Sequence, residues 1–206
     1  MVHTESVNSA TRGDLATLNR AHILDGFYLA GGTGLALHLG HRESIDLDFF
    51  RQDNFNEDRH LTDISALGNF SVDKKEVGTL TGKFESTLLS LFHYAYPLLE
   101  STVRWEGIEI ASVIDIACMK LDAASTRGTK KDFIDLYAII RRGSKTLPDL
   151  LKAFSNKYAS VSYNLMHIKK SLVFFADAES DPMPKMHADI QWEEVKSFFE
   201  KEVPKL

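Results

Sequence analysis

Two glycines followed by two alternating aspartates constrain this chain more than any other feature of its sequence. Gly31 and Gly32 end a short apolar run, which predicts a strand that enters a tight turn. Asp46 and Asp48 lie within residues 44–50 (SIDLDFF), where apolar residues at alternate positions predict a second strand. Side chains two positions apart on a strand share a face and lie about 6–7 Å apart. The two carboxylates should therefore project together beside the glycine turn.

This pair of carboxylates favours a cation site. Two carboxylates that project together repel each other unless water solvates them or a divalent cation lies between them. Hard oxygen ligands favour Mg²⁺ or Mn²⁺ over zinc. Ile45, Leu47 and Phe49 flank the aspartates, which indicates a largely buried strand in which a charged group needs a partner. An Asp-x-Asp pair by itself is common on exposed strand edges, so the metal hypothesis for Asp46 and Asp48 depends on the preceding glycine turn.

The turn after the first strand has the features of a phosphate-binding site. Glycines let backbone N–H groups approach phosphate oxygens closely, and the N-terminus of the following helix adds a partial positive charge. Thr33 is placed to cap that helix and to offer its hydroxyl to the same phosphates. Arg42 is close enough in sequence to pair with a phosphate or with Asp46.

A second dense cluster of charged residues occupies positions 115–137 (DIACMKLDAASTRGTKKDFIDLY). On a helix, Lys120 and Arg127 are seven residues apart and share a face, and Asp132 lies on the next predicted helix. Residues 119–145 hold seven basic and three acidic residues, a local charge of +4 in a chain whose net charge is −5. This basic island is a candidate site for phosphate or an RNA backbone. The plainer alternative is a solvated helical hairpin in which Lys120 and Asp132 form a structural ion pair.

The order of predicted elements indicates an α+β fold. Strands are expected at 27–30, 44–50 and several places between 70 and 110, and helices at 10–25, from Thr33, and at 54–67, 113–127, 131–141, 147–157, 162–176 and 190–202. We expect residues 1–111 to form a domain with a mixed sheet and helices. Residues 112–206 should form a C-terminal helical domain packed against that sheet, with a site between the two.

Composition narrows the class of protein. The chain has 206 residues, of which 44% are hydrophobic and 26% charged, as in an ordinary soluble protein. The net negative charge argues against a globally basic nucleic-acid coat. No stretch approaches the roughly 20 apolar residues of a membrane span, and the polar N-terminus lacks the apolar core of a signal peptide. We therefore expect a cytoplasmic protein with no membrane partner, whose single cysteine, Cys118, is buried and inert.

Several aromatic and histidine residues leave two interpretations open. His93, Tyr94 and Tyr96 could stack on a nucleobase, although such residues are more often core aromatics with polar tips. His38 and His41 are spaced as metal ligands can be, but no cysteine or further histidine accompanies them. We expect them to be surface histidines.

Both clusters resemble motifs of the AbiEii/AbiGii-type nucleotidyltransferase toxin family, which belongs to the polymerase β-like nucleotidyltransferase superfamily. The superfamily signature has an apolar residue, two small residues, a gap of about a dozen positions and then alternating acids. The matching residues, in chain order, are Ala30-Gly31-Gly32, Arg42, Ser44, Asp46-Leu47-Asp48-Phe49, Asp115-Ile116-Ala117, Lys120, Ala123-Ala124, Arg127-Gly128, Lys131-Asp132 and Asp135-Leu136-Tyr137. The matched motifs and the β-rich stretch between them extend the resemblance over roughly residues 20–142.

The resemblance implies a nucleotidyltransferase-type sheet and a definite activity. That activity is the Mg²⁺-dependent (or Mn²⁺-dependent) transfer of a nucleotide from a nucleoside triphosphate to an acceptor, expected to be RNA such as tRNA. The protein would be the toxin of a bacterial toxin–antitoxin or abortive-infection system, with a cognate antitoxin as partner. The implied catalytic residues are Asp46, Asp48, Lys120 and Asp132, with Asp46 and Asp48 as metal ligands. The implied nucleotide-binding residues are Gly31, Gly32, Thr33, Arg42, Ser44, Lys120 and Arg127.

One position departs from the superfamily pattern. Many nucleotidyltransferases carry a third carboxylate on a later strand, and the strand predicted at 86–94 contains none. Glu85 or Glu109 could supply it if the fold brings either close, and Asp132 is a further substitute.

Two alternatives to an active enzyme therefore stay open. The first is a catalytically lapsed relative that binds a nucleotide or a partner protein without transferring anything. The second is a protein in which Arg42 and Lys120 neutralise Asp46 and Asp48, so that nothing binds.

Overall fold

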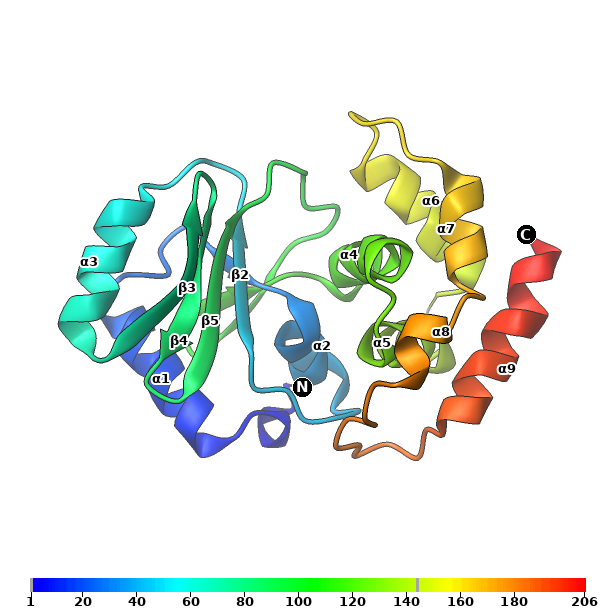
Figure 1. Cartoon of the computed structure of the whole chain (residues 1–206), viewed down its shortest axis with the longest axis horizontal. Coiled ribbons are helices and arrows are strands. Elements are labelled where there is room, and N and C mark those ends of the chain that lie inside the picture. Colours follow the sequence, from blue (N-terminus) through cyan, green and yellow to red (C-terminus); the bar gives the residue numbers. More distant parts are fainter. Residues whose placement is uncertain (1, 144) are drawn as a thin grey trace.

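The computed structural model describes residues 2–143 and 145–206, and one mixed sheet organises the first half of the chain. Its strands are β1 (Tyr28–Leu29), β2 (Leu47–Arg51), β3 (Phe70–Glu76), β4 (Thr79–Phe84), β5 (Thr87–His93), β6 (Val103–Trp105) and β7 (Ile108–Ile110). They form a seven-stranded sheet in the order β3-β4-β5-β2-β1-β7-β6 (Figure 1).

Helices cover both faces of this sheet and make up the rest of the chain. They are α1 (Ser9–Arg20), α2 (Gly31–Leu39), α3 (Glu57–Leu67), α4 (Val113–Thr126), α5 (Lys130–Arg141), α6 (Leu147–Lys157), α7 (Leu165–Ser171), α8 (Ala176–Glu179) and α9 (Trp192–Glu202), with short 3₁₀ turns η1 (Thr4–Ser6) and η2 (Val203–Lys205). Figure 1 shows α1 and α3 on one side of the sheet, and α2 followed by α4 and α5 on the other. No helix in the two described stretches is long and apolar enough to cross a membrane.

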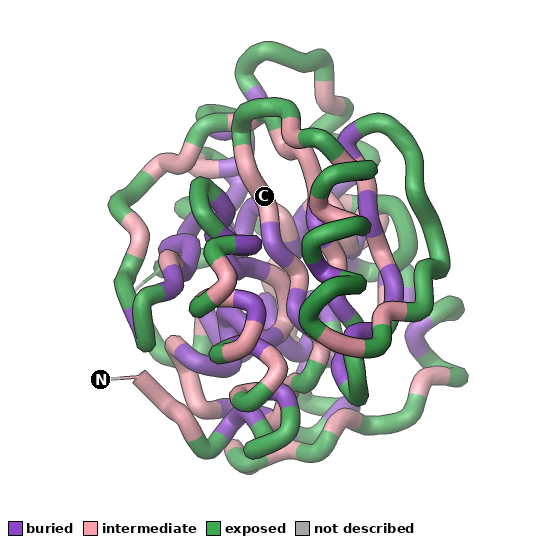
Figure 2. The backbone as a smooth tube through the Cα atoms, turned by 90° about the vertical axis from the view of Figure 1, so that its left-hand side faces the viewer, coloured by how far each residue is buried: buried purple, intermediate pink, exposed green. Residues whose placement is uncertain are grey.

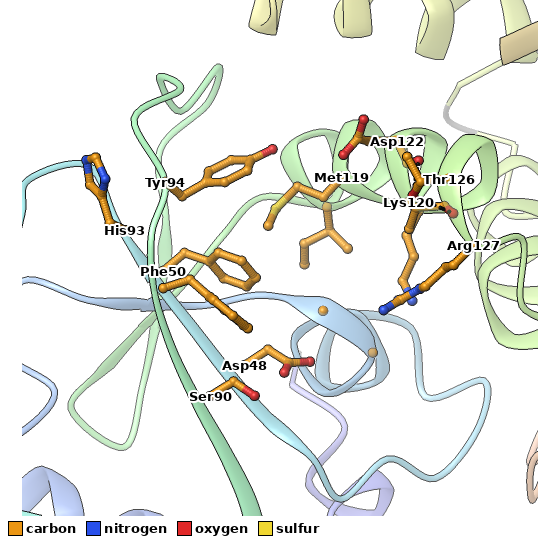
Figure 3. A pocket seen from close by; sticks show the side chains of 15 residues that line it. Asp48, Phe50, Ser90, His93, Tyr94, Met119, Lys120, Asp122, Thr126 and Arg127 are labelled. Carbon is orange, nitrogen blue, oxygen red and sulfur yellow. Dashed lines mark hydrogen bonds between the residues drawn. The ribbon is translucent and has the colours of Figure 1, made fainter. Parts of the chain in front are cut away.

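The centre of the sheet sets the positions that matter for a site. β2 pairs in parallel with β5 and antiparallel with β1. The β2–β5 register places Asp48 opposite Ser90 and Phe50 opposite Phe92. Because strand residues alternate between faces, these four side chains lie on the same face of the sheet, and that face looks toward α4 (Figure 3).

Two groups of buried apolar residues hold the layers together. One packs between the sheet and α1 and α3, and includes Leu18, Phe49 and Ile64. The other joins the opposite face to α4 and the later helices, and includes Leu35 and Phe133. Figure 2 shows that the buried residues gather toward the middle of the molecule and that the outer helices and loops carry most of the exposed residues.

The α+β class and the mixed sheet are as the sequence predicted, and Cys118 is buried. Some boundaries were wrong. The helix expected at 162–176 is two short helices, α7 and α8. α2 begins at Gly31 with Ala30 as its N-cap, so Thr33 lies inside the helix and does not cap it. β2 begins at Leu47, so Asp46 lies just before the strand. The division into domains at residue 111 stays a prediction, although every strand precedes it in the described chain.

A buried ion pair fastens α6 to α4. The Lys157 ammonium, at the end of α6, donates to Asp115 Oδ1 (2.8 Å) and to the Pro97 carbonyl oxygen (2.7 Å). Asp115 also accepts from the backbone N–H groups of Leu99 (2.9 Å) and Glu100 (3.2 Å). Both charged side chains are fully buried. Such a pair is costly to break because the remaining charge loses its partner.

We therefore expect Lys157→Met to lower the free energy of unfolding by about 3–5 kcal/mol, since it leaves the Asp115 carboxylate buried without a cation. Lys152→Met, on the exposed side of the same helix, is the matched control and should change stability by less than about 0.5 kcal/mol. Urea unfolding of both variants measures the difference. Equal losses in the two would contradict a structural role for this pair.

Candidate active site

A cleft lies between the sheet and α4, and it has two adjoining lobes. Four residues line both lobes: Gly32, Asp48, Lys120 and Arg127. The first, which we call the polar lobe, has a volume of about 380 Å³ and is further lined by Arg42, Ser44, Asp46, Thr129, Lys131, Asp132, Asp181 and Pro182. The second, the aromatic lobe, has a volume of about 500 Å³ and is further lined by Gly31, Phe50, Ser90, Phe92, His93, Tyr94, Ile116, Met119, Asp122, Ala123 and Thr126.

Asp46 and Asp48 share the wall of the polar lobe, as the sequence predicted. The Thr33 hydroxyl anchors the backbone there by donating to the Asp46 carbonyl oxygen (2.5 Å), and it lies 3.0 Å from the Ser44 hydroxyl. Burial raises the pKa of Asp48, and the negative charge of Asp46 raises it further. Asp48 therefore faces a second negative charge in an open cleft, which is the electrostatic condition for binding a cation.

The two glycines are required by how closely the chain approaches these side chains. Gly31 has φ of +60°, and a Cβ built on it would lie 2.5 Å from Asp48 Oδ2. A Cβ on Gly32 would lie 2.5 Å from an Arg42 guanidinium nitrogen and 3.0 Å from Ser44 Oγ. A side chain at either position would force these neighbours to move, and at Gly31 the positive φ would add backbone strain. The backbone at the N-terminus of α2 therefore lies against the acidic wall of the cleft.

A buried carboxylate ties the loop after α2 to α4 and α5. Asp135, on α5, accepts from Arg42 Nε (2.7 Å) and Nη2 (2.8 Å) and from His41 Nε2 (2.8 Å). The Lys120 ammonium lies 2.7 Å from Asp135 Oδ2, the oxygen that also accepts from Arg42 Nη2. We call this group of four residues the Asp135 clamp. Burial alone would raise the pKa of Asp135, but Lys120 and Arg42 outweigh it and hold that pKa well below its usual range.

Asp132 extends this network to the mouth of the cleft. It accepts from Lys120 (2.9 Å), from Arg127 Nε (3.1 Å) and Nη2 (3.2 Å), and from the Thr129 hydroxyl (2.7 Å). Burial would raise the pKa of Asp132, but Lys120 and Arg127 outweigh it and lower the pKa. The side chain of Lys120 is only 7% exposed, whereas that of Arg127 is 63% exposed. Lys120 thus remains charged inside the cleft, and Arg127 can reach a ligand at its entrance.

The structure brings together nearly all of the residues predicted from the sequence. Those that line the cleft are Gly31, Gly32, Arg42, Ser44, Asp46, Asp48, Lys120, Arg127 and Asp132. Thr33 does not line it, because its hydroxyl points to the Asp46 backbone. The roles assigned to all ten residues stay predictions. The structural ion pair between Lys120 and Asp132 is present, and it lies within this cleft.

Two expectations about pairing were wrong. Arg42 forms its ion pair with Asp135, not with Asp46, and the ion pairs of Lys120 are with Asp132 and Asp135. Arg42 and Lys120 therefore do not neutralise Asp46 and Asp48, and that alternative is wrong. His41 is also not a surface residue. It is 3% exposed, and its Nε2 donates to Asp135 Oδ1.

The third carboxylate is absent from the strand beside Asp48. The residue in register with it on β5 is Ser90. Glu85 accepts from the Asn69 N–H (2.8 Å) at the end of β4, and Glu109 from the Thr102 hydroxyl at the sheet edge, so neither lines the cleft. Among the described residues, no three or more His, Cys, Asp or Glu side chains are grouped as a metal cage. Two carboxylates nevertheless fit Mg²⁺, which commonly takes one or two of them and completes its shell with water and substrate phosphates.

Two features of the cleft were not predicted from the sequence. Asp135 had no assigned role, and its partner Arg42 is 93 positions away. Phe50 was interpreted only as a sign of a buried strand and Phe92 had no role, although each follows a cleft residue by two positions on its strand. That period-2 spacing was the available signal. Tyr94 continues the same face and lines the cleft, whereas Tyr96 does not.

Comparison with known proteins finds relatives of the chain in both sequence and fold. Over 190 residues the chain is 39% identical to an uncharacterized protein of Aquifex aeolicus (strain VF5), a match covering 88% of each chain. It resembles a candidate nucleotidyltransferase from H. pylori, with a TM-score of 0.55, 18% identity and coverage of 96% of this chain and 98% of that one. It also resembles MenT4, a nucleotidyltransferase toxin of Mycobacterium tuberculosis H37Rv, with a TM-score of 0.53, 16% identity and coverage of 96% and 86%. At these identities the two solved structures establish the fold alone.

The family described as the nucleotidyl transferase AbiEii toxin of type IV toxin–antitoxin systems matches residues 14–87 and 92–205. The chain belongs to the AbiEii nucleotidyltransferase toxin family. This confirms the resemblance stated from the motifs, and by its family the protein is a nucleotidyltransferase. Residues 88–91, which include Ser90, fall between the two segments that match the AbiEii family.

We expect Asp48→Asn to raise the free energy of unfolding at neutral pH, because it removes a charge that burial and Asp46 disfavour. The pKa of Asp48 is higher in the folded than in the unfolded state, so the folded state binds the proton more readily. The destabilisation caused by the charged carboxylate therefore disappears as the pH falls through that raised pKa. The stabilisation should be largest near pH 7 and fade toward about pH 4.

Urea unfolding across this pH range measures the effect. Asp73→Asn, on the exposed face of the edge strand β3, removes the same charge elsewhere and should change stability by less than about 0.5 kcal/mol. A loss of stability in Asp48→Asn at pH 7 would show that the Asp48 carboxylate stabilises the fold, contrary to this account.

Proposed function

We propose that this protein transfers a nucleoside monophosphate from a nucleoside triphosphate to a hydroxyl of an RNA acceptor, such as tRNA, in a Mg²⁺-dependent or Mn²⁺-dependent reaction. The observation that carries the proposal is the arrangement of the cleft, with Asp46 and Asp48 on the sheet wall and Lys120 and Arg127 on the facing helix wall. Figure 3 shows Lys120 and Arg127 extending from α4 toward Asp48. Opposite charges across an open cleft suit a triphosphate whose charge is shared between a cation and basic side chains.

In this proposal each residue type has a separate task. Asp46 and Asp48 would hold the metal ion, which when bound supplies positive charge to the phosphates. Lys120 stays protonated between Asp132 and Asp135 and neutralises charge on the triphosphate. Backbone N–H groups of Gly31 and Gly32, at the N-terminus of α2, approach phosphate oxygens.

For this reaction the protein mainly has to position the reactants and stabilise the developing charge. The acceptor oxygen forms a bond to the α-phosphorus while the bond from that phosphorus to the bridging oxygen breaks, and pyrophosphate leaves. The hydroxyl proton passes to water or to a carboxylate in the cleft. Lys120 and Arg127 stabilise the charge that develops on the phosphate oxygens. Asp132 holds the Lys120 and Arg127 side chains in place, and its lowered pKa favours the ionised form that does so.

The family supports a biological setting. The AbiEii description refers to type IV toxin–antitoxin systems, and we propose that this chain is the toxin of such a pair and has a cognate antitoxin. MenT4, which shares the fold, is named as a nucleotidyltransferase toxin. A toxin that acts on RNA would work in the cytoplasm.

A lapsed enzyme is the second candidate, and one observation favours it. Ser90 occupies the β5 position in register with Asp48, so that strand offers no carboxylate to activate the acceptor hydroxyl. Such a protein would bind a nucleoside triphosphate with metal and transfer nothing.

The direct test is incubation of the protein with each labelled nucleoside triphosphate and total RNA, with and without Mg²⁺. We expect label in RNA with the wild type and a loss of about 10²-fold or more with Asp46→Asn or Asp48→Asn, comparable to removing one preorganised electrostatic group. Removal of Mg²⁺ with a chelator should abolish transfer. Asp73→Asn is the control for the change in net charge and should retain activity.

Undiminished labelling by both aspartate variants, with their folds intact, would exclude the proposed chemistry. Metal-dependent nucleotide binding without labelling of any RNA would instead support the lapsed enzyme. In that case Ser90→Asp, which adds a carboxylate in register with Asp48, provides a gain-of-activity test of the same explanation.

A further inference from the structure

The aromatic lobe has no task in the phosphate chemistry described above. We infer that it binds the base of the incoming nucleotide and that Asp122 selects bases carrying an exocyclic amino group over uracil. This inference rests on the proposed function, because it assumes that the triphosphate lies in the polar lobe.

The walls of the aromatic lobe suit a flat ring. Phe50 and Phe92 are stacked, with ring centroids 5.2 Å apart, and Tyr94 meets Phe50 edge-on at 5.5 Å. Met119, on α4, lies across from them (Figure 3). The volume of about 500 Å³ falls in the range of about 300–1,000 Å³ typical of small-molecule sites. Aromatic faces stack on any base, so this surface explains binding of a base but not selection among bases.

The residues where the two lobes meet determine which end of the nucleotide lies in which lobe. Gly32, Asp48, Lys120 and Arg127 line both lobes, so they lie where the two meet. A triphosphate held by these residues extends into the polar lobe, whose other residues include Asp46, Asp132 and Lys131. An uncharged base gains little from those charges and loses apolar contact there. The opposite lobe, with its aromatic surface, is the favourable place for it.

Asp122 is the acid that distinguishes this lobe from a plain stacking surface. It lies three residues after Met119 on α4, so both side chains are on the side of the helix that lines the lobe. Burial raises the pKa of its carboxyl, and the hydrogen bond with the Tyr163 hydroxyl opposes that rise. Asp122 forms no ion pair within residues 2–143 and 145–206. The nearby Thr126 hydroxyl donates to the Asp122 carbonyl oxygen (3.0 Å) and is not free to offer its proton. The group presented to a ligand is therefore an acceptor.

An ionised carboxylate accepts hydrogen bonds and donates none. Cytosine, adenine and guanine each carry an amino group that can donate to it. Uracil presents a single N–H between two carbonyl oxygens, and a carboxylate beside those oxygens is repelled. Because a site built around one hydrogen-bonding partner rejects the analogue that lacks it, the position of Asp122 predicts discrimination by the amino group.

The test compares nucleotides that differ at an amino group but have the same ring size. Binding of CTP and UTP, and of GTP and ITP (which lacks the 2-amino group of GTP), is measured by titration calorimetry on the full chain with Mg²⁺. We expect the amino-bearing member of at least one pair to bind at least about tenfold more tightly. Asp122→Asn, which can also donate, should reduce that ratio to about threefold or less, whereas Asp73→Asn should leave it unchanged.

The possible results separate this inference from the proposed function. If nucleotides bind in an Asp48-dependent way but both pairs bind alike, or if Asp122→Asn keeps the wild-type ratio, the inference is wrong and the proposed function stands. If Asp122→Asn changes only which RNA is extended, the base in this lobe belongs to the acceptor, and the inference is again wrong. If no nucleotide binds, or if Asp48→Asn binds as the wild type does, the proposed function fails and this inference fails with it.

Discussion

Asp135 accepts hydrogen bonds from Arg42 and His41 and pairs with Lys120, so side chains from the loop after α2 and from α4 converge on one buried carboxylate of α5. A carboxylate at this depth without partners would cost several kcal/mol, so the four groups hold one another in place. Arg42 lies a few residues before Asp46, and the clamp therefore fixes the start of β2 relative to α4. The separation between the acidic wall and the basic wall of the cleft depends on this interaction.

The two aspartates on the sheet side of the cleft form no ion pairs within the described residues, whereas the basic side chains on the helix side are paired. Lys120 and Arg127 are matched by Asp132 and Asp135, which preserve their charge and orientation. Asp48 forms no ion pair within residues 2–143 and 145–206, and its pKa is raised by burial and by Asp46. A protein selected only for stability would not keep a carboxylate at such a position. A cation bound between Asp46 and Asp48 would remove the repulsion between them, which explains why the site keeps both carboxylates.

The local parts of this site could be predicted from the sequence, because each depends on neighbours in the chain. Glycines at a turn and aspartates two positions apart predict two carboxylates beside a glycine turn, and the structure has that arrangement, although α2 already begins at Gly31 and Asp46 lies just before β2. The long-range parts could not be predicted. Nothing local distinguishes Arg42 pairing with Asp46 from Arg42 pairing with Asp135, and the sheet register that sets Ser90 against Asp48 depends on the whole fold. The burial of His41 and the break between α7 and α8 likewise follow from tertiary packing.

A crystal structure of the protein with Mn²⁺ and a non-hydrolysable α,β-methylene nucleoside triphosphate would test the account most directly. Anomalous scattering locates Mn²⁺ independently of any assumption about the ligand. We expect a manganese peak coordinated by carboxylate oxygens of Asp46 and Asp48, with the triphosphate between that ion and Lys120. Manganese and triphosphate bound outside the cleft, or a cleft in which neither aspartate coordinates the ion, would contradict it.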